Sequence, residues 1–115
     1  MRDFQRQCLA TLQPVLGALV VEPQWHAVEC EPNEVLGHEA GDVYCRAEFE
    51  HGGHSYDLCV YTDEAGAHVD GRWFIYERPD CKNEDLRLIA AFTRFIEYCL
   101  SGTPAKDAYR LALRA

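Results

Sequence analysis

Six cysteines and five histidines are the residues of this chain best suited to bind a metal or to act in catalysis. Zinc sites formed by nearby residues use spacings such as C-x-x-C, and no two cysteines here have that separation. The closest pairing is His51 and His54, on either side of Gly52-Gly53, and a third ligand would have to come from elsewhere. Exposed turn residues explain both histidines, so we predict no metal site and no cofactor.

A cysteine nucleophile needs a paired base and surroundings that stabilise its thiolate. Cys81, between Asp80 and Lys82, is the cysteine we expect to be exposed, but the surrounding acids would raise its pKa. Glu48 and Glu50 lie about 7 Å apart on one face of an expected strand, as solvated carboxylates often do. Phosphate-binding glycine loops are missing from the sequence. We therefore predict that the protein is not an enzyme; a small enzyme using Cys81 or a histidine is the alternative.

Charge is distributed unevenly along the chain, whose net charge is −8. Residues 22–85 carry 16 acidic and 4 basic side chains, a net charge of −12, whereas residues 1–21 have a net charge of +1 and residues 86–115 of +3. Such a distribution repels nucleic acid and anionic membranes and steers a basic partner toward the middle segment. We therefore predict a protein partner with a basic surface and no direct binding of nucleic acid.

The elements that must position these residues follow from hydrophobic periodicity. Apolar residues recur every three or four positions over residues 3–19, which predicts a helix that Pro14 kinks or shortens. Alternation with a period of two predicts strands over residues 25–31, 42–50, 55–62 and 67–77. Gly52-Gly53 fits the two-residue turn of a hairpin between the second and third strands. A wide apolar face predicts a long helix over residues 84–100, and Thr103-Pro104 begin another helix.

This order predicts an α+β fold with an N-terminal helix, a four-stranded antiparallel meander and two C-terminal helices packed on one face of the sheet. We expect residues 1–115 to form a single domain, because no linker long enough to divide the chain is present. The other face of the sheet is expected to stay exposed to solvent. It should carry Tyr44, Arg46, Glu48 and Glu50 on one strand and Asp57, Cys59 and Tyr61 on the paired strand.

Membrane insertion and export are not predicted. The longest apolar run, residues 15–21, is far shorter than the roughly 20 residues needed to cross a bilayer, and the N-terminus lacks the apolar segment of a signal peptide. Three of the cysteines occupy inward-facing positions, which favours free thiols in a reducing compartment. We therefore expect a cytoplasmic protein without a membrane partner.

Carboxylates and tyrosines mixed on one surface are suited to contact a basic protein surface. In size, acidity and α+β class the chain resembles immunity proteins that neutralise bacterial toxins, and anti-defence inhibitors that mimic the charge of DNA. The resemblance implies an inhibitor that occludes a basic surface of its partner. We predict that the partner is contacted by Tyr44, Tyr61, Glu29, Glu31, Glu48, Glu50, Asp57 and Asp63.

Two other interpretations remain open from the sequence. The acidic surface could serve solubility alone, or the chain could be an acidic secretion-type chaperone, a class that it resembles in acidity and fold class and that typically forms homodimers. The inhibitor hypothesis requires that the carboxylates of the middle segment gather on one outward surface. It also requires that neighbouring arginines do not neutralise them.

Overall fold

The computed structural model describes residues 1–114 of the 115-residue chain. Its elements, in chain order, are α1 (Asp3–Ala18), β1 (His26–Glu29), β2 (Val43–His51), β3 (His54–Val60), β4 (Ala65–Val69), β5 (Arg72–Tyr76), the 3-10 turn η1 (Arg78–Cys81), α2 (Asp85–Leu100) and α3 (Ala105–Arg114). This arrangement confirms the α+β class, and the number of strands differs from the prediction.

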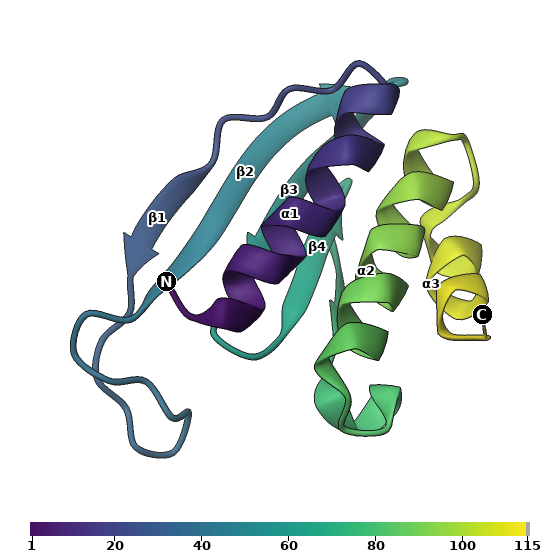
Figure 1. The fold of residues 1–115 in the computed structure, drawn as a ribbon. Coiled ribbons are helices and arrows are strands. Elements are labelled where there is room, and N and C mark those ends of the chain that lie inside the picture. The colour runs from purple at the N-terminus through teal and green to yellow at the C-terminus, as the bar shows by residue number, and fades with distance from the viewer. Residues whose placement is uncertain (115) are drawn as a thin grey trace.

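The five strands form one antiparallel sheet in the order β1-β2-β3-β4-β5. Figure 1 shows α1 and α2 side by side across one face of the sheet, with α3 packed beside α2. We call this helix-covered side the inner face and the opposite side the outer face. Because side chains alternate between the two faces along each strand, the register decides which residues each face presents.

The segment predicted as one strand over residues 67–77 is a hairpin. Asp70 and Gly71 both have positive φ, 51° and 81°, as a two-residue hairpin turn requires, and Val69 pairs with Arg72 across it. The prediction of four strands is therefore wrong. The turn also reassigns the faces: Phe74 lies on the inner face with Val69, and Trp73 lies on the outer face.

Pro14 does not end α1, which continues to Ala18. Proline removes the hydrogen bond to the carbonyl four residues earlier, that of Ala10. Both Ala10 and Pro14 are exposed, so water can satisfy this carbonyl and the loss is small. Of the two predicted effects of Pro14, a kink or a shortened helix, the shortening is therefore wrong.

The core lies between the inner face and the two central helices. Its fully buried side chains include Leu12 of α1, Leu58 of β3, and Phe92 and Phe95 of α2, each stabilising the fold by about 1.5–3 kcal/mol relative to exposure. All six cysteines are free and buried, as the prediction of free thiols required. Among residues 1–114, no helix is long and apolar enough to cross a membrane.

Candidate functional site on the outer face of the sheet

The outer face carries a row of aromatic rings that crosses the sheet. The rings of Tyr44 on β2 and Tyr61, just beyond β3, have centroids 5.2 Å apart, and those of Tyr61 and Trp73 are 6.4 Å apart in an edge-on arrangement. His68 on β4 contacts Trp73 with centroids 4.5 Å apart. Four rings from four segments therefore form one continuous aromatic surface, which we call the aromatic row.

Gly66 makes room for the indole in this row. A Cβ atom at Gly66 would lie 2.8 Å from Cη2 of Trp73 and 2.7 Å from the carbonyl oxygen of Phe74, closer than real Cβ contacts come. The indole of Trp73 therefore rests directly on the backbone of β4. Even so, 38 % of Trp73 remains exposed, a large value for an aromatic residue held in a fixed position.

A charged cluster adjoins the aromatic row. The guanidinium of Arg46 donates to Asp57 through Nε at 3.0 Å and through Nη2 at 2.9 Å, and Nη2 also donates to Glu48. Two of the expected acids are thus paired with an arginine, contrary to the condition that the inhibitor hypothesis set. The side chain of Glu50, at the end of the same strand face, forms no hydrogen bond or ion pair with any residue in 1–114 and is exposed.

Cys59 and His68 complete this cluster around Asp57. The β3–β4 register places Asp57 directly opposite His68, with Cys59 two residues further along β3. The Sγ atom of Cys59 lies 3.8 Å from Oδ1 of Asp57, and Nδ1 of His68 lies 3.7 Å from Oδ2. One ligand atom from each of the three residues lies within 4.8 Å of the other two.

Acid-base chemistry argues against a nucleophilic Cys59. Burial, and next the charge of Asp57, raise the pKa of the Cys59 thiol to about 11, so the thiolate is scarce near neutral pH. Burial likewise raises the pKa of Tyr61 well above its ordinary value. The cluster therefore has the donor atoms of a ligand set but not the electrostatics of a cysteine nucleophile.

The structure gathers part of the predicted contact set. Tyr44, Glu48, Glu50, Asp57 and Tyr61 lie on the outer face or continue it, as their alternation along the chain indicates. The remaining three lie elsewhere: Glu29 pairs with Val43 and belongs to the inner side, Glu31 lies in the loop after β1, and Asp63 lies in the β3–β4 turn. The expectation that these carboxylates share one surface is wrong for Glu29, and Glu31 and Asp63 lie outside the strands that form the outer face.

Sequence reasoning missed His68 and Trp73 as members of this face. The placement of His68 follows from the β3–β4 register. That of Trp73 depends on the Asp70-Gly71 turn, for which the sequence offers a signal because Asp-Gly is a preferred hairpin dipeptide. The pairing of Arg46 with Asp57 could also be predicted from the sequence. The turn at Gly52-Gly53 sets Glu48 opposite Asp57 and so places Arg46 on the diagonal position that long side chains can span.

Two other groups of candidate residues from the sequence, Cys81 and the His51–His54 pair, have surroundings in the structure that the sequence does not predict. Cys81 is buried, with 5 % exposed, and burial and then Asp80 raise the pKa of its thiol; the expectation that it is exposed is wrong. His51 and His54 pair across the Gly52-Gly53 turn. His54 binds Asp70 through Nδ1 at 2.6 Å, so this ring nitrogen is already engaged.

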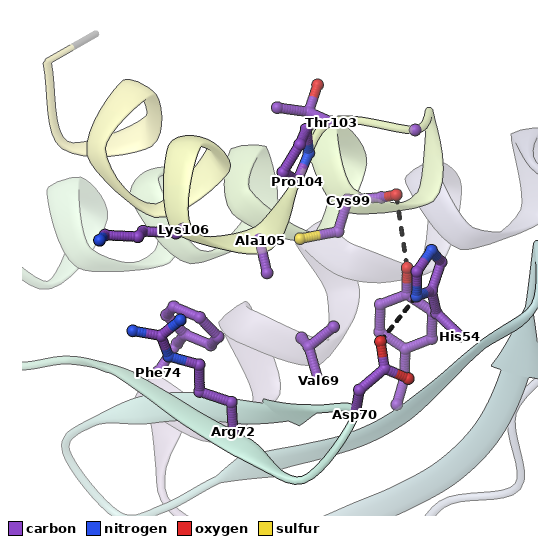
Figure 2. Close-up of a pocket in the computed structure, with 12 residues that line it drawn as sticks. His54, Val69, Asp70, Arg72, Phe74, Cys99, Thr103, Pro104, Ala105 and Lys106 are labelled. Atoms are coloured by element: carbon purple, nitrogen blue, oxygen red, sulfur yellow. Dashed lines mark hydrogen bonds and ion pairs between the residues drawn. The ribbon is translucent and has the colours of Figure 1, made fainter.

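A pocket lies where the β4–β5 hairpin faces the start of α3. Figure 2 shows this pocket, of about 460 Å³, with His54 and Asp70 at one end and Arg72 and Lys106 at the other. Phe74 forms part of its apolar lining, and the Arg72 guanidinium lies 5.6 Å from the centre of that ring. The pocket thus combines an apolar interior with polar groups of both signs at its rim.

Comparison with known proteins adds no functional information. No protein-family model matches the chain, and neither a curated protein nor a solved structure shows significant similarity to it.

Proposed function

We propose that this chain is a small acidic protein-binding protein of the inhibitor type, which docks its outer face on a basic surface of a partner protein and occludes that surface. The observation that carries the proposal is the sheet face without a covering helix. On this face, Tyr44, Tyr61 and Trp73 form a continuous row, and Glu48 and Glu50 lie on the same face.

The aromatic row supplies the anchors of the proposed interface. Tyrosine and tryptophan are enriched among the residues that dominate binding energies. Here the rings of Tyr44, Tyr61 and Trp73 already contact one another, so binding would freeze few additional rotamers. Pre-ordering of this kind lowers the entropic cost of association.

The carboxylates of the outer face act mainly on the rate and specificity of encounter. Glu48, Glu50 and Asp57 against Arg46 leave this face with a formal charge of −2, within a chain of net charge −8. Charge of this sign accelerates the approach of a basic surface, and added salt weakens this attraction. The pairing of Arg46 with Asp57 makes aromatic contacts, more than charge, the source of affinity.

The test is capture of the partner with a matched set of variants. Immobilised wild-type chain, an aromatic variant (Tyr61→Ala with Trp73→Ala), a charge variant (Glu48→Lys with Glu50→Lys) and a control with an equal change of charge on the helices (Glu97→Lys with Asp107→Lys) are exposed to the same source-cell lysate. Dissociation constants and association rates with the captured partner are then measured at two salt concentrations.

We expect the control to bind as the wild type does. The aromatic variant should weaken binding by about 2 kcal/mol or more, roughly 30-fold in Kd, and the charge variant should slow association and reduce its salt dependence. A partner that binds the two outer-face variants as tightly as the wild type would overturn the proposal. Capture only of a second copy, with a dimer on sizing, would instead support the chaperone interpretation.

A second candidate function follows from the pocket in Figure 2. A histidine whose Nδ1 is held by a carboxylate, as His54 is held by Asp70 at 2.6 Å, has its other ring nitrogen free to accept a proton, the arrangement of a general base. Arg72 and Lys106 at the rim fit an anionic group. This is the small-enzyme alternative with His54 in place of Cys81. It predicts changes in the NMR signals of His54 and Arg72 on addition of inorganic phosphate.

A further inference from the structure

We propose that Asp57, Cys59 and His68 form a site for a single divalent transition-metal ion of the zinc class on the outer face, with a fourth coordination position open. The inference does not depend on the proposed docking function. It concerns a cluster in which carboxylate, thiol and imidazole converge from two neighbouring strands.

Spacing among the three donors fits one small ion. Zinc binds sulfur at about 2.3 Å and nitrogen or oxygen at about 2.0–2.2 Å, so one sulfur and the nitrogen and oxygen ligands around a tetrahedral ion lie roughly 3.3–3.7 Å apart. The Cys59 Sγ–Asp57 Oδ1 separation is 3.8 Å, and the His68 Nδ1–Asp57 Oδ2 separation is 3.7 Å. These separations run to different oxygens of the Asp57 carboxylate, and one donor atom from each residue lies within 4.8 Å of the other two. Small rotations of the side chains toward one point would bring the three donors to the spacing of a shared ion.

His68 provides an independent sign that a ligand is expected. Its Nδ1 atom is buried and has no hydrogen-bond partner within the part of the chain that the structure describes. A buried nitrogen of this kind is unfavourable when it is left unsatisfied. It faces Asp57, and Trp73 packs against the ring, so coordination through Nδ1 would satisfy this nitrogen.

The charges around the cluster balance for a divalent ion. Arg46 and Glu48 neutralise each other, and Asp57 contributes one negative charge. When the metal binds, the S–H proton of Cys59 leaves to solvent and a metal–sulfur bond forms, which adds a second negative charge. The ion with two positive charges then makes the whole group neutral.

Arg46 is compatible with this role as an outer neighbour of a ligand. Carboxylates that bind metals are commonly held by further hydrogen bonds that orient them. The contacts from Nε and Nη2 of Arg46 to Asp57 are of that kind, and each carboxylate oxygen has a second lone pair for the ion. Mixed sulfur, nitrogen and oxygen donors suit zinc, and three protein ligands leave a fourth position for water.

Cobalt(II) titration of the purified, reduced full-length chain tests the site, because cobalt occupies zinc sites and reports thiolate ligands by absorption. We expect one equivalent of cobalt to produce a sulfur-to-cobalt charge-transfer band and the visible bands of a tetrahedral ion, both displaced by zinc. Cys30→Ser, at another buried cysteine, is the matched control and should keep the bands.

Two variants separate ligand loss from misfolding, and circular dichroism checks their fold. Cys59→Ser should abolish the charge-transfer band, and His68→Gln should weaken binding by more than the roughly 10- to 100-fold typical of an outer neighbour. No thiolate band in the wild type, or a band of unchanged strength and affinity in either variant, would overturn the proposal. A band lost equally in Cys30→Ser would also overturn it.

Discussion

At the residue scale, the close contact between Gly66 and Trp73 decides the shape of the outer face. We expect Gly66→Ala to destabilise the protein by about 1–3 kcal/mol, as overpacking typically does, because its Cβ would meet both the indole and the backbone of β5. Chemical denaturation measures the loss, and tryptophan fluorescence should show the displaced ring.

Gly17→Ala is the matched control for that experiment. Gly17 lies within α1, and a Cβ there meets nothing within 4 Å, so the substitution should be neutral or slightly stabilising through helix propensity. If Gly66→Ala proved as stable as Gly17→Ala, the close packing of Trp73 on β4 would be refuted.

Residue chemistry also explains what the sequence could and could not predict of the candidate site. Strand alternation was sufficient to place Tyr44, Glu48 and Asp57 on one face, because each lies in a clearly amphipathic strand. The Asp57, Cys59 and His68 cluster is different, because His68 joins the two β3 residues only through the β3–β4 register. Metal-ligand searches based on local spacing cannot find residues brought together across strands.

At the element scale, the strands are predicted correctly where the turn between them is identified from the sequence. The hairpin at Gly52-Gly53 was predicted correctly, since both glycines have positive φ and no side chain opposes that conformation. The turn at Asp70-Gly71 was overlooked because strong β-formers on both sides read as one continuous strand. Without this turn, the sequence predicts four strands instead of five and does not place Trp73 on the outer face.

The Asp70 carboxylate should make the β4–β5 hairpin sensitive to acid. Its pKa is held below its ordinary value by the backbone N–H of Ser55 and then by His54. A lowered pKa means that the folded state favours the ionised form, so this stabilisation is present above the unfolded-state pKa and is lost as the pH falls through the lowered value.

Asp70→Asn tests that contribution, because asparagine tolerates positive φ and preserves the turn. We expect the variant to be less stable at neutral pH and its melting temperature to fall less steeply toward acid pH than that of the wild type. Glu50→Gln, which removes an exposed carboxylate from the outer face, should leave the steepness unchanged. Parallel acid profiles for Asp70→Asn and the wild type would contradict the assignment.

At the scale of the whole molecule, the two faces of the sheet differ: the inner face packs the apolar core, and the outer face carries charged and aromatic side chains. The inner face is covered by α1 and α2 (Figure 1), and the outer face carries the aromatic row and the charged cluster. In the proposed function, Glu29 on the inner side and Glu31 and Asp63 outside the strands would add to the overall acidity that steers a partner and not to the contact patch. Binding specificity is therefore expected to come from the aromatic row, whose shape the register fixes.

Buried thiols couple the stability of the whole fold to alkaline pH. Burial raises the pKa of Cys8 in α1 and of Cys99 in α2 to about 12, from the ordinary thiol value of 9.0. A raised pKa means that the folded state retains protons which the unfolded chain releases. The contribution of these two thiols to the free energy of unfolding is therefore fully present below pH 9.0 and is lost progressively as the pH rises toward about 12.

The double variant Cys8→Ala with Cys99→Ala isolates this effect. It should be less stable than the wild type at neutral pH, because two buried side chains become smaller. Its free energy of unfolding should nevertheless decline less between pH 9.0 and about 12, because the variant lacks the two thiols that the unfolded chain deprotonates in this range. Urea denaturation across that range measures the decline, and equal declines in both proteins would mean that these thiols do not set the alkaline limit of the fold.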